Sequence, residues 1–368
     1  MKIGVPREIK PLEKRVSLPP QCVKILSDHG HEVFVENGAG AGSGFQDESY
    51  LEAGAELLDK PQEVWTAADM IVKVKEPIHP EFQWMRPGQV LFTYLHLAAD
   101  QRLTELLLEK QIIGIGYETV QLRDGTLPLL APMSEVAGAL SVQMGAYCLE
   151  AKNGGKGILL SGVPGVKPAR VTIIGGGVAG MAAATVAAGM GSRVSILDIN
   201  YPRLGYIRDV MRDCVATIHS NPANIEEECL ESDLVICTVL IPGAKAPRLI
   251  SRDLVRRMQK GSAIVDISID QGGCAETSRP TTHENPTYIE EGVVHYCVSN
   301  MPGAVPRTST IALTNATFHY VLALADKGWR RAMSEDPALR AGLNVHHGEI
   351  TCRAVAETFN MPCALPDF

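Results

Sequence analysis

The stretch that determines the fold is Val171-Thr172-Ile173-Ile174-Gly175-Gly176-Gly177-Val178-Ala179-Gly180. Its β-branched first half is typical of a short buried strand, and a glycine turn follows it directly. Small residues from Met181 to Met190 then predict a helix, and Val194–Leu197 predicts a second strand that leads to Asp198. The order strand, turn, helix, strand is that of a parallel α/β unit.

The three glycines of the Gly175-x-Gly177-x-x-Gly180 spacing each meet a separate requirement of dinucleotide binding. The first permits a tight turn, the second lets backbone approach a pyrophosphate, and the third lets the helix pack closely on the strand. The helix N-terminus offers free N–H groups and a partial positive charge to phosphates. Asp198 stands where an acidic side chain accepts hydrogen bonds from an adenosine ribose. Together these features predict a dinucleotide site.

Two other interpretations of this stretch are an ordinary glycine-rich turn and a membrane span. Residues 171–192 carry no charge between Arg170 and Arg193, and these 22 residues are enough to cross a bilayer. However, six glycines interrupt the run, and its pattern changes from β-branched to alanine-rich at the turn. The change of pattern and the acidic residue after the second strand favour the dinucleotide site.

The composition limits the class of protein. A chain of 368 residues predicts two domains of ordinary size, and 45% hydrophobic with 21% charged residues is typical of a soluble globular protein. The net charge of −8 gives no reason to expect nucleic acid or an anionic membrane as partner. Nine cysteines without a Cys-x-x-Cys pair fit reduced thiols in a cytoplasm, and we expect no signal peptide.

Short apolar runs alternate with helical patterns along the chain, which predicts crossover units and largely parallel sheets. The predicted strands are Lys2–Val5, His31–Glu36, Met70–Val74, Val90–Tyr94, Ile112–Tyr117, Leu234–Val239, Ala263–Ile267 and Val293–Val298. The predicted helices are Pro20–His29, Glu48–Leu58, Asp100–Lys110, a helix to about Lys152 with Ser134 as its N-cap, and Ser309–Asp326. The last two would form a hinge of two helices between domains, and a helical tail from Gly328 to Phe368 would rejoin the first domain.

Ligands bind beyond the carboxyl ends of parallel strands, so the residues at those ends are the candidates for a site. Arg15 and Lys75 could bind a carboxylate, and His96 could exchange a proton near neutral pH. From spacing alone a solvated loop charge is the favoured interpretation of Arg15, and Lys73 is expected to be solvated. Lys75 fits a solvated charge as well as a ligand group, and a histidine at the end of an apolar strand is more often a packed residue than a catalyst. Only the convergence of these groups at one edge favours a site. Asp270 is either a placed carboxylate or an Asx-turn residue. His346-His347 is interpreted as surface, and no metal site is expected.

Longer segments resemble the alanine dehydrogenase/pyridine nucleotide transhydrogenase family, in particular bacterial alanine dehydrogenase, over essentially the whole chain. The segments that carry the resemblance are Met1–Lys10, Lys73–Pro77, Tyr94–Ala98, Pro132–Gly138, Asp266–Cys274 and Asn300–Thr310. The resemblance implies reversible, NAD-dependent oxidative deamination of L-alanine to pyruvate and ammonium. It further implies that Arg15 and Lys75 hold the substrate carboxylate, and that His96 and Asp270 transfer protons.

The same resemblance implies the architecture and the cofactor contacts. Two Rossmann-like, doubly wound α/β domains are expected, with an NAD-binding domain (129–305) inserted in a discontinuous substrate domain (1–128 and 306–368), in a cytoplasmic homohexamer. Besides the three glycines, the residues implied to contact NAD are Ser134, Val178, Ala179, Asp198, Arg203, Ser220, Val239, Leu240, Ile267, Ser268, Ile269, Asp270, Arg279, Val298, Ser299, Asn300 and Met301.

Two departures from the family pattern and three rival functions remain. Residues 204–214 differ from the sequence usual in the family, which puts the helix after the ribose site in doubt. Ser268 stands where the family often has alanine. The rivals are the NAD-binding part of a nicotinamide nucleotide transhydrogenase, a saccharopine-type dehydrogenase, and a non-catalytic NAD-binding protein. The joint presence of Arg15, Lys75 and His96 favours the amino-acid dehydrogenase.

Overall fold

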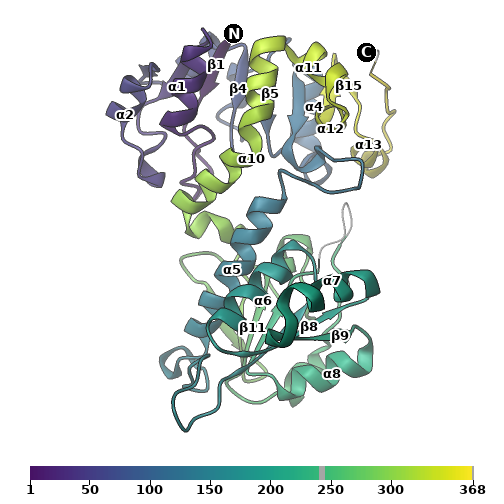
Figure 1. Ribbon diagram of the computed structural model, residues 1–368. Helices are drawn as coiled ribbons and strands as arrows, with labels where there is room; N and C mark the ends of the chain where they lie inside the picture. The colour runs from purple at the N-terminus through teal and green to yellow at the C-terminus, as the bar shows by residue number, and fades with distance from the viewer. Residues whose placement is uncertain (240–244, 367–368) are drawn as a thin grey trace. The chain divides into compact units, whose positions relative to one another are not determined.

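The computed structural model describes residues 1–239 and 245–366 and divides them into two compact units (Figure 1). The first comprises Met1–Met133 with Val305–Phe368, and the second comprises Ser134–Ala304. The second unit is therefore an insertion in the sequence of the first. The chain passes between the units at residues 133/134 and 304/305. The boundaries expected from the family resemblance were 128/129 and 305/306.

The first unit is built on an eight-stranded sheet in the order β15-β14-β6-β5-β4-β1-β2-β3. Six strands are parallel, whereas β14 runs antiparallel to both β6 and β15. The strands are β1 (Lys2–Val5), β2 (Glu32–Glu36), β3 (Glu56–Leu58), β4 (Met70–Val72), β5 (Val90–Thr93), β6 (Ile113–Gly116), β14 (Leu343–His346) and β15 (Glu349–Ile350). The direction of progression reverses at β1, whose neighbours are β2 and β4. A crevice beyond the carboxyl ends is expected at such a point.

The helices of this unit bury one face each against the sheet or one another. They are α1 (Pro20–Asp28), α2 (Asp47–Glu52), α3 (Pro61–Ala67), α4 (Gln101–Glu109), α10 (Pro306–Lys327), α11 (Trp329–Glu335), α12 (Pro337–Ala341) and α13 (Arg353–Phe359). Helix α10, yellow-green in Figure 1, is tied to the loop after β1. The Val16 N–H donates to Thr310 Oγ1 at 3.1 Å, and Thr314 Oγ1 donates to Ser17 O at 3.2 Å.

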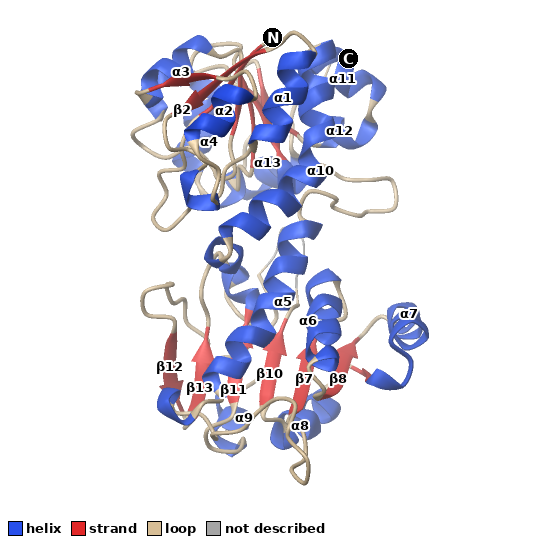
Figure 2. Cartoon of the chain, turned by 60° about the vertical axis from the view of Figure 1, so that its left-hand side comes forward, coloured by secondary structure: helices blue, strands red, loops and turns tan. Residues whose placement is uncertain are grey.

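The second unit contains a seven-stranded sheet in the order β12-β13-β11-β10-β7-β8-β9, most of which Figure 2 shows side by side. The strands are β7 (Arg170–Ile174), β8 (Arg193–Asp198), β9 (Val215–His219), β10 (Leu234–Cys237), β11 (Ala263–Asp266), β12 (Thr287–Glu290) and β13 (Val293–Tyr296). All pair in parallel except β12 with β13. The accompanying helices are α5 (Ala131–Cys148), α6 (Val178–Gly189), α7 (Tyr201–Met211), α8 (Pro222–Glu231) and α9 (Arg252–Arg257).

The predicted class, two doubly wound α/β domains, is confirmed. In each sheet the order in which successive strands are added reverses at the first strand, which is β1 in the first unit and β7 in the second. The membrane-span interpretation of residues 171–192 is wrong, since this run forms β7, the glycine turn and α6. Within residues 1–239 and 245–366, none of the helices combines the length and hydropathy that crossing a bilayer requires.

Several predicted elements are wrong in detail. The helix predicted over Glu48–Leu58 ends at Glu52, because Gly54 turns the chain at φ +92° into strand β3. Ser134 is not an N-cap, since α5 already begins at Ala131. The tail is not wholly helical, because β14 and β15 extend the first sheet.

Candidate active site

The loop after β1 buries Arg15 rather than exposing it, so the favoured interpretation as a solvated charge is wrong. Arg15 is 2% exposed, and its Nε donates to Glu13 Oε1 at 2.7 Å. Burial lowers the pKa of Arg15, but the hydrogen bonds that it donates to the Glu13 carboxylate raise the pKa by more, so the net shift is upward. Its Nη1 lies 3.1 Å from Met133 Sδ. Because a thioether is a weak acceptor, a carboxylate would compete well for this nitrogen.

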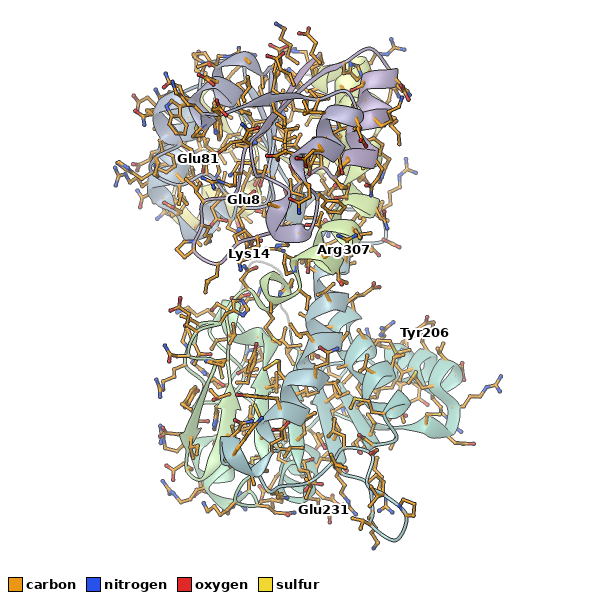
Figure 3. All side chains as sticks on the ribbon, turned by 90° about the vertical axis from the view of Figure 1, so that its left-hand side faces the viewer. Glu8, Lys14, Glu81, Tyr206, Glu231 and Arg307 are labelled. Atoms are coloured by element: carbon orange, nitrogen blue, oxygen red, sulfur yellow. The ribbon has the colours of Figure 1, made fainter. Side chains whose placement is uncertain are left out.

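Lys73 is also buried, which makes the expectation of a solvated side chain wrong. Its Nζ lies 2.8 Å from Glu81 Oε1 and 3.2 Å from Glu8 Oε2, and both glutamates are buried (labelled in Figure 3). Burial lowers the pKa of Lys73, but the two carboxylates raise it by more than burial lowers it. The net shift is upward, so the group is an ammonium. Glu8 Oε1 also accepts the Lys75 N–H at 3.3 Å. The buried trio therefore holds the backbone from which Lys75 projects.

Lys75 is half-buried and close to other cations. Burial and then the charge of Arg15 lower its pKa, and Lys10 acts in the same direction. Within the part of the chain that the structure describes, its amino group forms no hydrogen bond or ion pair. An ammonium held among cations is suited to receive an anion from outside the protein.

His96 follows β5 in the left-handed conformation, at φ 49° and ψ 33°. Such a conformation is uncommon for a non-glycine residue and has to be imposed by its surroundings. The Glu118 carboxylate supplies this constraint, since it accepts the Leu95 N–H at 3.1 Å and the His96 N–H at 2.6 Å. The imidazole stacks on Tyr94, with ring centroids 5.7 Å apart, and is 43% exposed at the side chain.

Arg15, Lys75 and His96 thus come from the carboxyl ends of the adjacent strands β1, β4 and β5. The glutamates that hold them were not among the predicted site residues. Glu13 orders Arg15, Glu8 orders Lys75, and Glu118 orders His96. The only signal in the sequence was position, because Glu8 and Glu13 follow β1 and Glu118 lies in the 3-10 turn that follows β6.

In the second unit, the glycine turn has the geometry that its spacing predicts. Gly175 adopts φ +109°, and a Cβ on Gly180 would lie 1.9 Å from Gly175 O, which only glycine avoids. A Cβ on Gly177 would meet no atom within 4 Å, so space is open beside this peptide. Gly177 caps α6 without a side-chain hydrogen bond, which leaves helix N–H groups directed outward.

Asp198 and Arg203 contact this turn, and Ser220 is hydrogen-bonded to Asp198. The Asp198 carboxylate accepts the Gly176 N–H at 2.6 Å, and the Ser220 N–H donates to Asp198 O at 3.0 Å. Arg203 Nη2 donates to Gly177 O at 3.4 Å. In the doubtful segment 204–214, residues up to Met211 belong to helix α7 and Arg212–Cys214 form a 3-10 turn. Asn200 caps α7 by accepting the Arg203 N–H at 3.0 Å.

The residues directly after β10, β11 and β13 lie at the same carboxyl edge of this sheet, because the three strands are parallel. Ser268 has room for its hydroxyl, which donates to Val239 O at 2.7 Å. Asp270 is exposed, and its Oδ2 accepts the Asn300 N–H at 3.5 Å. The guanidinium of Arg279 lies 4.0 Å from the Tyr288 ring centroid.

The remaining cofactor candidates fall at the same edge or on helices beside it. Val178 and Ala179 open α6, Ile267 and Ile269 lie in the 3-10 turn after β11, Val298, Ser299 and Met301 follow β13, and Ser134 lies within α5. Leu240 lies outside the described residues. The interpretation of His346 as surface is wrong, because His346 is 7% exposed and packs on Trp329 at 4.7 Å between ring centroids. Among described residues no group of three His, Cys, Asp or Glu is arranged to hold a metal.

Two family models match this chain. "Alanine dehydrogenase/PNT, N-terminal domain" matches residues 4–137, and "Alanine dehydrogenase/PNT, C-terminal domain" matches residues 141–353. The chain belongs to the alanine dehydrogenase/PNT family. Members of this family act with a pyridine nucleotide, which agrees with the glycine turn of the second unit.

Individual family members resemble the chain over nearly its full length. An alanine dehydrogenase of Methanococcus maripaludis is 54% identical over 98% of this chain and 97% of its own. Alanine dehydrogenase 2 of Staphylococcus aureus is 56% identical with the same coverage. A solved L-alanine dehydrogenase superposes with a TM-score of 0.95 at 50% identity, covering 98% of this chain and 99% of the other. A transhydrogenase of Sinorhizobium meliloti, at 24% identity and a TM-score of 0.82, shares the fold.

Proposed function

We propose that this chain is an NAD-dependent L-alanine dehydrogenase. It would convert L-alanine, NAD⁺ and water reversibly to pyruvate, ammonium and NADH with release of a proton. The observation that carries the proposal is identity of 54–56% to alanine dehydrogenases over 98% of the chain. The residues after β1, β4 and β5 supply the groups that an amino-acid substrate requires, namely cations for its carboxylate and an imidazole for its amine.

The second unit has the groups that would hold NAD. Open space at Gly177 and the N-terminus of α6, whose N–H groups have no side-chain cap, fit a pyrophosphate. Asp198 lies beside the turn, where its charge favours a ribose 2′-hydroxyl and opposes a 2′-phosphate, so NAD is the proposed coenzyme rather than NADP. When bound, the nicotinamide accepts the hydride that leaves the substrate α-carbon. The wider set of loop residues, including Arg279 and Asn300, is assigned to this site by the family resemblance.

The substrate groups are assigned to the first unit. Lys75 and Arg15 would bind the carboxylate of alanine, which orients the α-carbon. His96 would take a proton from the ammonium, because hydride can leave only when the amine nitrogen has a free electron pair to form the imine. His96 and Asp270 would then move the protons needed as water adds to the imine and ammonia leaves. General acid–base catalysis of this kind contributes on the order of 100- to 10,000-fold.

A direct assay tests the proposal. Purified chain is mixed with L-alanine and NAD, and NADH absorbance is followed from neutral to alkaline pH. We expect turnover with L-alanine, little with D-alanine, and a clear preference for NAD over NADP. Failure to reduce NAD at any pH would overturn the proposal. Hydride exchange between NADPH and an oxidised NAD analogue without amino acid would instead support the transhydrogenase alternative, and NAD binding without turnover would support a binding protein.

Two further proposals come from family resemblance. Residues 1–128 and 306–368 form the substrate domain and 129–305 the NAD-binding domain, and the chain assembles as a homohexamer in the cytoplasm. Sedimentation equilibrium tests the assembly, since a mass of six chains is expected and a monomer would contradict it.

A further inference from the structure

Glu76 bridges two groups at the carboxyl edge of the first sheet. Its Oε2 lies 3.1 Å from His96 Nδ1, and its Oε1 forms an ion pair with Lys10 Nζ. Lys10, Glu76 and His96 follow the adjacent strands β1, β4 and β5, so the sheet itself brings the three side chains together. Glu76 also directly follows Lys75, which the proposed function assigns to the substrate carboxylate.

The charge state of Glu76 determines the role of each imidazole nitrogen. Its side chain is 14% exposed, and burial raises its pKa, but the contacts with His96 and Lys10 outweigh burial and the net shift is well downward. Glu76 is therefore a carboxylate, which can only accept hydrogen bonds. The His96 nitrogen that faces it has to be the donor. A neutral His96 then carries its proton on Nδ1 and its free electron pair on Nε2.

The rest of the surroundings fix the ring in place without competing for Nδ1. Tyr94 stacks on one ring face, and Glu118 binds the backbone N–H of His96 rather than its side chain. Lys10 and Lys75 act through their charge on Glu76. The titratable groups that act on His96 or on the carboxylate that it faces thus include Tyr94 and Glu118 on one side and Lys10 and Lys75 on the other.

We propose that Glu76 is a positioning residue for His96, holding its Nδ1–H tautomer so that Nε2 receives the proton of the substrate ammonium. The proton moves from the substrate nitrogen to Nε2, which leaves a neutral amine and an imidazolium with both nitrogens protonated. Glu76 remains a carboxylate throughout and stabilises that imidazolium. This inference rests on the proposed function and deepens it, since it gives His96 the oriented partner that a general base requires.

The substitution Glu76→Gln tests this role, because the amide keeps the size of the side chain and removes its charge. We expect kcat/KM for L-alanine to fall about 10- to 100-fold, the size of loss known for removing the hydrogen-bond partner of a metal-bound histidine. The acid limb of the pH–rate profile should move to lower pH, because the imidazolium formed during the reaction loses its carboxylate partner. Glu76→Asp keeps the charge and should restore the position of the limb. NADH affinity should not change.

Controls separate positioning from a structural effect. Glu63→Gln, at an exposed glutamate of α3, should leave the rate and the pH profile unchanged. In a His96→Ala background, Glu76→Gln should cause no further loss, because Glu76 acts through His96. Equal loss in both backgrounds, or a full rate with an unmoved acid limb in Glu76→Gln, would overturn the inference.

A spectroscopic measurement does not depend on turnover. Nitrogen-15 NMR of the full chain, with the His96 signals assigned by their absence in His96→Ala, should show the Nδ1–H tautomer at alkaline pH. An Nε2–H tautomer would overturn the inference even if the enzyme is active. A wild-type chain that has the Nδ1–H tautomer but does not oxidise alanine would refute the proposed function and leave the tautomer assignment standing.

Discussion

At the scale of single residues, two lysines two positions apart have different tasks. Lys73 is buried between Glu8 and Glu81, whereas Lys75 is half-buried without a bonded partner among described residues. Strand alternation would place both lysines on one face, but β4 ends at Val72, so alternation no longer applies. The first lysine neutralises carboxylates that order the loop, and the second remains available to an anionic ligand.

Replacing Lys73 by methionine should destabilise the first unit strongly. Two buried carboxylates would lose their shared cation, and breaking a buried pair in this way costs about 3–5 kcal/mol. We expect the unfolding temperature to fall by on the order of 10 °C, measured by calorimetry. Lys60→Met, at a lysine 73% exposed in its side chain, is the matched control and should shift it little. An unchanged unfolding temperature for Lys73→Met would show that the trio does not contribute to stability.

The lowered pKa of Lys75 predicts a pH dependence of carboxylate binding. Burial and the Arg15 charge favour the neutral amine, so Lys75 should lose its proton below the ordinary lysine value of 10.5. The inhibition constant of propionate, an alanine analogue without the amine, should therefore rise as pH increases through that lowered pKa. In Lys75→Arg the cation persists, so binding should be weaker but independent of pH up to about 11. A wild-type constant that stays flat to pH 10.5 would contradict the assignment of Lys75.

Residue type and strand position predicted which side chains form the edge, but not their surroundings. Arg15 was expected in solvent because its partner Glu13 follows no recognisable spacing. Glu8 and Glu81 lie 65 and 8 positions from Lys73 and meet it only after the sheet has formed. Burial of charge depends on such tertiary pairing, which local pattern does not encode.

At the scale of elements, the β7–α6–β8 unit was predicted closely because turn and periodicity agree there. Short strands at sheet margins were missed. Strand β3 has three residues, none fully buried, so it lacks the alternation by which strands are recognised. Strands β9 and β12 also lie at margins of their sheet, where a mixed burial pattern gives the same weak signal.

Three glycines around α6 predict three different outcomes on substitution by alanine. Gly180→Ala places a Cβ against Gly175 backbone, so stability should fall by about 1–3 kcal/mol and NADH binding should weaken more than tenfold. Gly177→Ala meets no protein atom, so stability should hold while NADH affinity falls. Gly189→Ala, at an open site in the same helix, is the control and should stabilise by about 0.4–1 kcal/mol. Calorimetry and NADH fluorescence measure these effects, and unimpaired affinity in Gly177→Ala would refute close approach of the cofactor there.

At the scale of the whole molecule, the two sheets share one core order. Starting from one edge strand, the first sheet has the order β3-β2-β1-β4-β5-β6. The second sheet has the corresponding order β9-β8-β7-β10-β11-β13. The segment after the central strand differs between the units. After β7 comes the glycine turn and, at once, α6, whereas after β1 the chain runs through residues 6–19 without a glycine before α1 begins at Pro20. The same scaffold is thus expected to serve a dinucleotide in one unit and a small anion in the other.

This difference predicts one dinucleotide site in each chain. The first unit lacks a helix N-terminus directly after its central strand, and side chains such as Arg15 and Glu8 occupy the carboxyl edge where a pyrophosphate would otherwise bind. Calorimetric titration of NADH should therefore reach saturation at one molecule per chain, and Gly180→Ala should weaken that binding. Lys75→Ala should leave the stoichiometry and affinity for NADH unchanged while it weakens propionate binding. A second NADH site, or titration that persists at full affinity in Gly180→Ala, would mean that the first unit also binds dinucleotide, because the glycine turn itself belongs to the second unit.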